Sequence, residues 1–458
     1  MNLHLDFVID SVKGQLLTGS GSSVSRVSTD SRQMSPGTLF VALKGEHYDG
    51  HDYIATAIEA GASAVLVSRR DLILPSECGA AIILVDDTLL ALQELAASYR
   101  QRFSLPVIAI TGSVGKTTTK DLLAGLLASR FRTLKTQGNF NNEIGLPLTL
   151  FHLQPEHQAA VLEMGMRAPG EIRQLASLLD PTYAIITNVE AVHLETMGSL
   201  ENIARAKCEV LDFIRKDGFA LINGDNELLV QTVGNYACKT YRFGYKARND
   251  IQIMSLVNDG VGIHVNLKLF ASQAEFYLPL PVNQLASNLA AAAGMAFLMG
   301  VGSNEIKAAL KDFKPDGNRM NMIPLDAGGV VIDDSYNANP TSVMAALEAC
   351  RQISQGRRKV AVLGDMLELG SYGKEGHLQV GHKVAHMEMD ILVTIGKLAQ
   401  YYREGAIEQG MEASRTHHFD SREAALEWLK ANVSPADIVL FKASRGMHLD
   451  KLVQDWMG

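Results

Sequence analysis

Residues 107–120 read VIAITGSVGKTTTK, an apolar run followed by a glycine-containing turn and a stretch of polar residues. The apolar run predicts a buried β-strand, and the residues beyond the turn predict a helix from about residue 117 to residue 129. Glycines allow a turn to fold around an anion, and the amides at the start of the helix point toward that anion. The stretch therefore predicts a phosphate-binding loop between a strand and a helix of an α/β domain.

The side chains of this loop suit the triphosphate of ATP. Lys116 is expected to reach the β- and γ-phosphates, and the Thr117 hydroxyl is expected to ligate Mg²⁺. Ile110 occupies the position that usually holds the first glycine of such a loop, and the chain has no NKxD motif for guanine, which disfavours a GTPase. We expect the nucleotide contacts of the loop to come from Gly112, Ser113, Val114, Gly115, Lys116, Thr117 and Thr118.

Short apolar runs alternate with amphipathic stretches, such as residues 89–99 and 341–353, along most of the chain. Apolar strands alternating with helices predict parallel sheets that are covered on both faces. The predicted strands are residues 65–67, 81–85, 106–110, 159–162, 184–187, 330–332, 360–363, 391–395 and 438–441.

The length of 458 residues exceeds what one hydrophobic core usually serves, so the chain is expected to contain several domains. A new strand opens after residues 104–106 (SLP), and residues 315–318 (PDGN) form a turn cluster. We predict domains at 1–103, 104–314 and 315–458. Within the second domain, residues 250–280 predict a β-hairpin insertion and the alanine-rich residues 285–299 predict a buried helix.

The composition is typical of a globular protein, with 47% hydrophobic and 20% charged residues. A net charge of −8 disfavours a nucleic-acid-binding surface. The four cysteines lack metal-ligand spacing and are expected to be free thiols in a reducing cytosol; they are Cys78, Cys208, Cys238 and Cys350. No signal peptide and no run of about 18 apolar residues is found, so we expect a cytosolic protein without membrane insertion.

Two further segments bring polar groups toward the phosphate loop. Glu163 follows the predicted strand 159–162 directly, at the edge where open α/β sheets bind ligands. After strand 184–187 comes the segment NVEAVHLE (188–195), which contains His193. Such a glutamate alone is usually a helix cap and such a histidine is usually solvated. Beside a phosphate loop a functional role is favoured for both residues, because phosphoryl transfer needs cations and oxygen ligands suit Mg²⁺.

The combination resembles the Mur ligase family, which shares the TG[ST]xGK[ST] loop, an EMG segment, the NVxxxHLE segment and a following KxE segment. The resemblance implies ATP and two Mg²⁺ ions, with Thr117 at the metal and Glu163 and His193 holding the second ion. It also implies that Lys207 is carbamylated and offers an anionic oxygen to this metal; an ordinary salt-bridging lysine is the alternative. Catalysis is then expected to depend on Lys116, Lys207 and His193.

The first domain contains STDSR (28–32) and PGTLFVALKG (36–45), followed by DGH (49–51). These motifs resemble the UDP-sugar-binding domain of the family. The resemblance implies that Ser31 and Arg32 lie against the nucleotide of the UDP substrate, where the planar fork of arginine suits a diphosphate. A solvent-exposed turn arginine is the alternative.

The third domain contains DDSYNANP (333–340) and GDMLELG (364–370), with His377 downstream. Both motifs resemble the branch of the family that adds D-alanyl-D-alanine to a UDP-muramoyl-tripeptide. The resemblance implies that Asp334 faces the ATP ribose, and that Asn337 and Asn339 lie beside the phosphates or the incoming amine.

Other positions depart from the family pattern. Of the GRHNxxN segment only Asn288, the expected adenine contact, is kept in PVNQLASN (281–288). The family's GR dipeptide appears here as GNR (317–319), with Arg319 as the expected ATP contact. The family's KGSR segment appears as KASR (442–445).

The sequence thus predicts three α/β domains: a smaller N-terminal substrate domain, a central P-loop ATPase domain with a mostly parallel sheet, and a C-terminal doubly wound Rossmann-like domain. The expected activity is ATP-dependent amide-bond formation through an acyl phosphate in peptidoglycan biosynthesis. The expected partners are small molecules, namely ATP, a UDP-muramoyl-tripeptide and D-alanyl-D-alanine, and the expected state is a monomer. Two alternatives are a sibling ligase that adds a single amino acid and a nucleotide switch that forms no amide.

Overall fold

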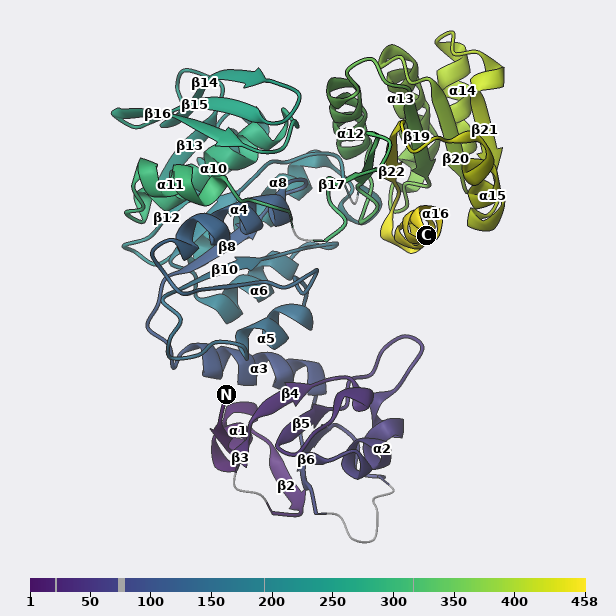
Figure 1. The fold of residues 1–458 in the computed structure, drawn as a ribbon. Coiled ribbons are helices and arrows are strands. Elements are labelled where there is room, and N and C mark those ends of the chain that lie inside the picture. The colour runs from purple at the N-terminus through teal and green to yellow at the C-terminus, as the bar shows by residue number, and fades with distance from the viewer. Residues whose placement is uncertain (21–22, 73–78, 193, 316) are drawn as a thin grey trace.

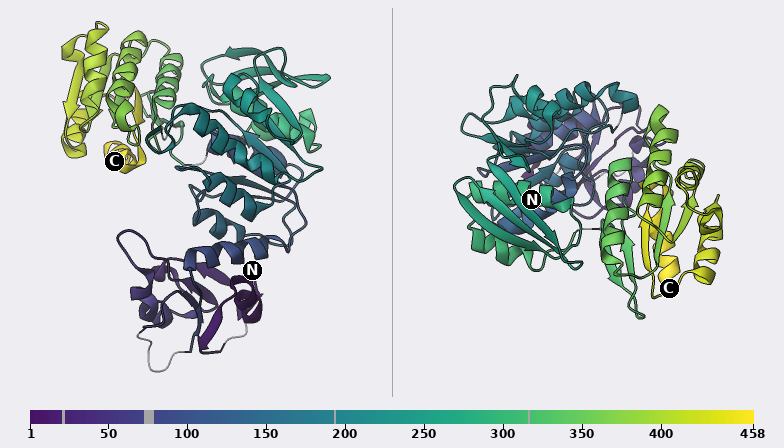
Figure 2. Two further views of the ribbon diagram at one scale, coloured as in Figure 1. Left: turned by 180° about the vertical axis from the view of Figure 1, so that it is seen from behind. Right: turned by 90° about the horizontal axis from the view of Figure 1, so that it is seen from above.

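A computed structural model of the chain describes residues 1–20, 23–72, 79–192, 194–315 and 317–458. The predictions for Cys78 and His193 therefore lie outside the described residues. Three large sheets form three α/β bodies that follow one another along the sequence (Figure 1). The N-terminal body lies at one end of the central body, and the C-terminal body lies beside the other end, as the views from behind and above also show (Figure 2).

The N-terminal body contains a five-stranded sheet in the order β2-β7-β6-β5-β4, in which β2 is an antiparallel edge and the other pairs are parallel. A two-stranded ribbon of β1 and β3 lies beside it. The strands are β1 Leu3–His4, β2 Gln15–Thr18, β3 Ser23–Val24, β4 Arg26–Ser28, β5 Thr38–Val41, β6 Ala62–Val67 and β7 Ala81–Leu84. The helices are α1 Leu5–Val12, α2 Ile54–Glu59 and α3 Thr88–Arg100.

Helix α3 joins the N-terminal body to the central one, since it packs against α1 on one side and against α5 and α6 on the other. Arg100 ends this helix and is almost fully buried. Its guanidinium donates to the carbonyl oxygens of Leu179 at 3.1 Å and Phe103 at 2.7 Å. A single hydrophobic cluster runs through both bodies, so this junction is packed like a protein interior.

The central body contains a nine-stranded sheet in the order β16-β15-β14-β13-β12-β11-β8-β10-β9. Strand β8, which precedes the phosphate loop, lies inside the sheet between β10 and β11 and is parallel to both. The strands are β8 Val107–Thr111, β9 Thr133–Lys135, β10 Ala159–Glu163, β11 Tyr183–Ile186, β12 Phe219–Asn223, β13 Thr240–Gly244, β14 Ile251–Asn258, β15 Ile263–Leu269 and β16 Ser272–Leu278.

Strands β14, β15 and β16 form the segment predicted as a β-hairpin insertion. They are antiparallel to one another, but β14 also pairs with β13 in parallel. The segment is therefore a three-stranded meander that extends the central sheet. Ile251 and Ile253 of β14 are buried, and this burial gives the first strand its place against the sheet.

Helices cover both faces of the central sheet. On one face α4, α10 and α11 share a cluster with Ile108 and Ile110 of β8, and on the other face α5 and α6 pack over Val107 and Ala109. The alanine-rich stretch forms the buried helix α10, as predicted. The helices are α4 Lys116–Ala128, α5 Gly145–Leu150, α6 Glu171–Leu179, α7 Leu194–Met197, α8 Leu200–Cys208, α9 Glu227–Val233, α10 Leu285–Leu298 and α11 Ser303–Leu310.

The C-terminal body contains a six-stranded sheet in the order β17-β18-β22-β19-β20-β21, antiparallel only at β17. Helices α12, α13 and α14 cover one face, and α15 and α16 cover the other, so the predicted doubly wound domain is confirmed. The strands are β17 Asn321–Pro324, β18 Val330–Asp333, β19 Lys359–Gly364, β20 Ile391–Ile395, β21 Thr416–Phe419 and β22 Ile438–Lys442. The helices are α12 Pro340–Ile353, α13 Gly373–His386, α14 Gln400–Glu408, α15 Arg422–Asn432 and α16 Leu449–Met457.

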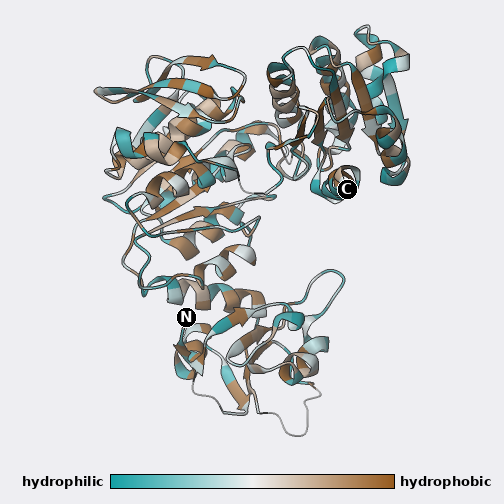
Figure 3. Cartoon of the chain, in the orientation of Figure 1, coloured by the Kyte–Doolittle hydropathy of each residue, from teal (hydrophilic) through white to brown (hydrophobic). Residues whose placement is uncertain are grey.

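All nine predicted apolar runs fall on strands, and the two amphipathic stretches fall on α3 and α12. Hydrophobic residues concentrate in the strands of all three sheets (Figure 3). In the described part of the chain, none of the helices has the length and apolar character needed to span a bilayer. Cys208, Cys238 and Cys350 are free thiols, as predicted.

Candidate active site

The loop between β8 and α4 has a backbone shape that requires glycine at two positions. Gly115 has a φ of 84° and precedes α4, and Gly112 has a φ of 149°. A Cβ on Gly112 would lie 1.9 Å from Thr187 Oγ1, and one on Gly115 would lie 2.3 Å from Asn288 Nδ2. The two glycines therefore bring the backbone close to neighbouring side chains and leave the amides at the start of α4 available to an anion.

The end of strand β11 holds this loop in place. The Thr187 hydroxyl donates to the Val114 carbonyl oxygen at 2.6 Å, and the Val114 amide donates to Asn188 Oδ1 at 2.9 Å. The Ser113 amide donates to the Asn188 carbonyl oxygen at 3.1 Å. Thr187 and Asn188 were not predicted as site residues, although their position directly after a strand that neighbours β8 is a usable signal.

Lys116 begins α4, and its ammonium group curls back over the loop. Its Nζ donates to the carbonyl oxygens of Gly112 at 2.7 Å and Ser113 at 3.3 Å. Desolvation lowers the pKa of the Lys116 amine; the nearby Glu163 carboxylate raises it and the Arg319 guanidinium lowers it further. The predicted phosphate-contacting lysine thus lies at the loop, with one carboxylate and a second cation nearby.

Glu163 ends β10 and is joined directly to the phosphate loop helix. Its Oε2 accepts from the Thr117 hydroxyl and its Oε1 accepts from Asn141 Nδ2, both at 2.7 Å. The Glu163 amide donates to the Thr136 hydroxyl at 2.9 Å. The carboxylate is almost fully buried, so these donors fix its orientation. Asn141 and Thr136 were missed by the sequence analysis because they come from loops without a recognisable motif.

Lys207 lies near the end of α8 with only 2% of its surface exposed. Burial, helped by the positive charge of Lys116, places the pKa of the Lys207 amine well below its usual range. In the described part of the chain no hydrogen bond or ion pair engages its amine. A buried lysine in this setting favours the neutral amine, since an unpaired buried charge is very costly.

Thr117 and Glu163 bring two hard oxygen donors together beside the loop. Among the described residues, no group of three His, Cys, Asp or Glu side chains gathers in a way that could hold a metal ion. His193, the third predicted ligand, lies outside those residues. The roles of Thr117, Glu163, His193 and Lys207 at a metal therefore stay predictions.

A cavity of about 530 Å³ lies beside the phosphate loop. It is lined by three groups of residues: the loop and the end of β11, the loops after β12 and β13, and the first turns of α10 and α12. We call it the nucleotide cavity. Its lining includes Val114, Gly115, Thr119, Thr187, Asn188, Glu190, Asn223, Asp225, Asn226, Phe243, Tyr245, Asn283, Gln284, Ser287, Asn288, Ala291, Thr341, Ser342 and Ala345.

Asn288, the expected adenine contact, lies in the wall of the nucleotide cavity. Its Nδ2 donates to Thr119 Oγ1 at 2.9 Å and to the Gly115 carbonyl oxygen at 3.2 Å, so it ties α10 to the phosphate loop helix. Gln284 occupies the region of the missing family histidine. Its Nε2 donates to Glu348 Oε2 of α12 at 2.9 Å, a contact between the central and C-terminal bodies.

In the C-terminal body Asp334 is buried and both of its carboxylate oxygens are engaged. Oδ1 accepts from the Met320 amide at 3.1 Å, and Oδ2 forms an ion pair with Lys442. Two guanidinium groups lie over the Tyr336 ring, with Arg319 at 4.0 Å and Arg445 at 4.9 Å from its centre. Arg319 therefore extends from the C-terminal body toward Lys116, whose pKa it affects.

The two asparagines of the DDSYNANP motif differ in their surroundings. Asn337 is exposed, and its carbonyl oxygen accepts from Lys442 Nζ at 3.0 Å. Asn339 is the N-cap of α12, where its Oδ1 accepts from the Ser342 amide at 2.9 Å. The side chain predicted to contact substrate thus also caps a helix through its Oδ1, and its side-chain Nδ2 is the group that can donate to a ligand.

Ser31 and Arg32 lie in a short 3-10 turn on the surface of the N-terminal body. The Arg32 side chain is 87% exposed and forms an ion pair with Asp30 at 2.9 Å. The structure does not bring either residue into the nucleotide cavity. Their predicted contact with a UDP group stays a prediction.

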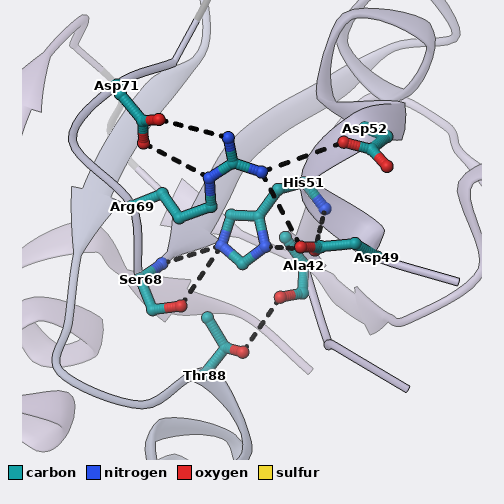
Figure 4. A network of polar contacts seen from close by, with 8 residues as sticks. All are labelled: Ala42, Asp49, His51, Asp52, Ser68, Arg69, Asp71 and Thr88. Atoms are coloured by element: carbon teal, nitrogen blue, oxygen red, sulfur yellow. Dashed lines mark hydrogen bonds and ion pairs between the residues drawn. The ribbon is translucent and has the colours of Figure 1, made fainter. Parts of the chain in front are cut away.

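The DGH motif of the same body forms a polar network around the buried His51 (Figure 4). Ser68 donates its amide to His51 Nε2 at 2.9 Å, so Nδ1 carries the hydrogen and donates to Asp49 Oδ1 at 2.6 Å. Burial alone raises the pKa of Asp49, but the His51 hydrogen bonds and the Arg69 charge lower it overall. Arg69 also forms an ion pair with Asp71 at 3.3 Å. The network fixes the segment after β5 against the end of β6.

Comparisons with known proteins agree in three consecutive regions of the chain. Residues 23–100 match the description "Mur ligase family, catalytic domain", residues 110–296 match "Mur ligase middle domain", and residues 318–445 match "Mur ligase, glutamate ligase domain".

Two curated relatives match over nearly the whole chain, and both carry the name UDP-N-acetylmuramoyl-tripeptide–D-alanyl-D-alanine ligase. The protein from Bacillus subtilis (strain 168) is 39% identical, over 98% of this chain and 97% of the relative. The protein from Escherichia coli (strain K12) is 36% identical, over 99% and 98%.

Solved structures agree with these relatives. A crystal structure of MurF from Acinetobacter baumannii has a TM-score of 0.90 at 31% identity and covers 100% of this chain and 99% of its own. A structure of MurF ligase from Thermotoga maritima in complex with ADP has a TM-score of 0.82 at 29% identity, over 94% and 96%.

Proposed function

The chain belongs to the Mur ligase family, and on that premise we propose that it joins D-alanyl-D-alanine to UDP-N-acetylmuramoyl-tripeptide with consumption of ATP. The product is the UDP-muramoyl-pentapeptide, a precursor of peptidoglycan. The relatives named for this activity match over nearly their full length, and the ADP complex of a similar structure supports the use of ATP.

One observation of the structure carries the chemistry of this proposal. The buried carboxylate of Glu163 accepts a hydrogen bond from Thr117 of the phosphate loop helix, and Lys116 lies within electrostatic reach of both Glu163 and the buried amine of Lys207. An ATP-binding regulator needs the loop alone. A second buried polar centre beside it suits a site that must also hold a reacting carboxylate.

The proposed reaction has two steps. A carboxylate oxygen of the tripeptide attacks the γ-phosphorus of ATP, and ADP leaves with the electrons of the broken bond. The amine of D-alanyl-D-alanine then attacks the acyl carbon, loses a proton and displaces phosphate, which is a far better leaving group than hydroxide. Lys116 and the amides of the loop neutralise charge on the phosphoryl group as it transfers.

The residues present fit the Mg²⁺ that the family implies. Thr117 Oγ1 and Glu163 Oε2 are hard oxygen donors 2.7 Å apart at the end of the loop, and Mg²⁺ prefers such ligands. We propose that Thr117 would hold one Mg²⁺ ion and that Glu163 and His193 would hold the second. Mg²⁺ bound there supplies positive charge to the phosphate oxygens.

We propose further that Lys207 is carbamylated. Carbon dioxide adds only to a neutral amine, and burial together with the charge of Lys116 favours the neutral form here. The lysine nitrogen bonds to the carbon of carbon dioxide and releases one proton to solvent, which leaves an anionic carbamate. This group would balance the positive charge that gathers around Lys116 and the metal.

Different domains are proposed to bind different substrates. The proposed domain boundaries lie between residues 103 and 104 and between residues 314 and 315. Ser31 and Arg32 of the first domain are assigned to the UDP group. Asn288, Arg319 and Asp334 are assigned to ATP, and Asn337 and Asn339 to the phosphates or the incoming amine. A cytosolic monomer stays the prediction for location and state.

The proposal is tested by offering purified protein ATP, Mg²⁺ and UDP-muramoyl-tripeptide together with one amine at a time. D-Alanyl-D-alanine is expected to support ADP release and a product whose mass equals the sum of both substrates less water. Free lysine or diaminopimelate is expected to support neither. ADP release with a single amino acid would assign the chain to a sibling activity, and release without any acceptor would indicate a nucleotide switch.

A further inference from the structure

Glu190 lies in the wall of the nucleotide cavity, and none of the roles assigned above uses it. Its backbone is fixed to the phosphate loop by a reciprocal pair of hydrogen bonds. The Glu190 amide donates to Ser113 Oγ at 2.9 Å, and the Ser113 hydroxyl donates to the Glu190 carbonyl oxygen at 3.1 Å. The side chain is therefore held at a set distance from the phosphate end of the cavity.

The carboxylate of Glu190 is only half satisfied by the protein. Its Oε1 accepts from Asn188 Nδ2 at 2.9 Å. Its Oε2 is buried and has no hydrogen-bond partner among the described residues. The hydroxyl of Thr341 interacts with the same carboxylate without meeting the geometry of a hydrogen bond. A buried acceptor that has lost its hydrogen bonds to water and has gained no protein donor costs free energy. A donor group of a bound ligand would remove this cost.

The order of groups along the cavity indicates which part of a nucleotide supplies that donor. The phosphate loop is at one end, and Asp225 and Tyr245 belong to the loops after β12 and β13. A nucleotide whose phosphates bind the loop places its ribose next and its base beyond. Glu190 is bonded to Ser113 and lines the cavity beside the loop. The ribose is the first part of a bound nucleotide after the phosphates, so its hydroxyls are the donor groups nearest to this carboxylate.

Chemistry narrows the choice further. A phosphate oxygen is repelled by a carboxylate, whereas a ribose hydroxyl donates to one. Asp225, another acid of the cavity, is already engaged, since it accepts from the amides of Tyr245 at 2.6 Å and Lys246 at 3.0 Å. Asp334, the acid predicted at the ribose, also has both oxygens engaged. Glu190 is therefore the carboxylate of the cavity wall with a free oxygen.

We propose that Glu190 is a nucleotide-specificity residue whose free carboxylate oxygen accepts a hydrogen bond from a ribose hydroxyl of ATP. The inference rests on the proposed function only in taking this cavity as the ATP site. Glu190 positions the nucleotide and takes no part in the bond-making steps.

The test measures binding of ADP, 2′-deoxy-ADP, 3′-deoxy-ADP and IDP by calorimetry, because ADP binding needs neither the tripeptide nor the dipeptide. The variants are Glu190→Ala and Glu190→Gln. The control is Glu227→Ala, an exposed acid of α9 that pairs with Lys246 and does not line the cavity. Thermal unfolding of each variant shows whether it folds, and the Gln variant preserves size if the Ala variant does not.

The unaltered protein is expected to bind ADP about 10- to 100-fold more tightly than at least one deoxy analogue, the range of a hydrogen bond to a charged group. Glu190→Ala is expected to bind ADP as weakly as that analogue, Glu190→Gln to lie between, and Glu227→Ala to match the unaltered protein. If the unaltered protein and both Glu190 variants prefer ADP over the deoxy analogues by the same factor, the proposal is overturned. Discrimination against IDP alone that vanishes in the variants would also overturn it, in favour of a base contact.

Discussion

At the scale of single residues, the active site places the partly exposed Lys116 within electrostatic reach of the buried Lys207. Lys116 keeps its ammonium near Glu163 and the loop carbonyls, and its charge lowers the pKa of Lys207. Two neighbouring ammonium groups repel each other, and burial adds to this effect at Lys207, so Lys207 is the lysine that loses its proton more easily. Lys116 is therefore suited to be the cation that contacts phosphate, and the neutral amine of Lys207 is suited to react with carbon dioxide.

Replacement of Lys116 by alanine tests the role of the cation. The variant is expected to lose ligation by about 10²-fold or more, because the transferring phosphoryl group loses a charge that stabilises its transition state. Steady-state ADP release measures the effect, with the exposed Lys311→Ala as control. Near-normal turnover in a folded Lys116→Ala protein would show that the phosphate-loop assignment is wrong.

Replacement of Lys207 separates a carbamate from an ordinary buried lysine. Lys207→Ala is expected to be nearly inactive and to recover partly with acetate or formate, which can occupy the vacated oxygen positions. Lys207→Arg is expected to stay inactive, because guanidinium forms no such carbamate and keeps its charge.

A readout independent of activity is the ¹³C resonance of a carbamate after incubation with labelled bicarbonate. It is expected in the unaltered protein and absent from Lys207→Arg. An active arginine variant, or the same resonance in it, contradicts the assignment.

At the scale of elements, local pattern was enough to predict most helices and strands. The run at β8 and the alanine-rich α10 are clear because each element has one periodicity and one environment. The bounds predicted for residues 250–280 enclose the meander, but a hairpin has two strands and the structure has three. The third strand, β16, pairs only with β15 at the edge of the sheet, and alternation along the sequence does not reveal that pairing. Asn339 shows a second limit, since one side chain caps α12 and also belongs to a family motif.

His377 links α13 to the loop after β19, and the stability that this contact provides depends on pH. Its Nε2 accepts from the Met366 amide at 3.0 Å, while Nδ1 faces the Gly373 carbonyl oxygen at 2.6 Å, so the ring is neutral. Burial lowers the pKa of His377 from its ordinary value of 6.5. The unfolded chain therefore takes up a proton first as pH falls, and the stability contribution is present above pH 6.5 and lost below it.

The unfolding free energy is expected to fall by up to about 1.4 kcal/mol for each pH unit in that window. Urea unfolding at several pH values between 7 and 5 measures it. His377→Gln can donate to Gly373 and accept from Met366 without titrating, so its slope is expected to be smaller. Identical slopes in both proteins would refute the account of this contact.

At the scale of the whole molecule, the nucleotide cavity spans two bodies. The first turn of α12 contributes Thr341 and Ser342, while the other walls belong to the central body. Two polar contacts connect the bodies beside it: Gln284 with Glu348, and Asn258 Nδ2 with Gln352 Oε1 at 2.8 Å. Nucleotide bound there touches both bodies, so it is suited to fix their relative position before the amine arrives.

The sequence could not predict this arrangement of bodies. The contacts between them involve single polar side chains without periodicity, such as Gln284 and Asn258, which look like ordinary surface residues. Ser31 and Arg32 carry a family motif yet lie on a different body from the phosphate loop. Site residues on one sheet edge, such as Glu163 and the loop, were predictable because parallel strands end together.

The central claim is that ATP activates the tripeptide carboxylate as an acyl phosphate, and isotope transfer tests it most directly. UDP-muramoyl-tripeptide labelled with ¹⁸O in its terminal carboxylate is incubated with ATP, Mg²⁺, D-alanyl-D-alanine and the protein. The released phosphate is then analysed by mass spectrometry. Phosphate that carries one ¹⁸O from the carboxylate is the predicted result. Phosphate without label, released together with pentapeptide, would contradict the account.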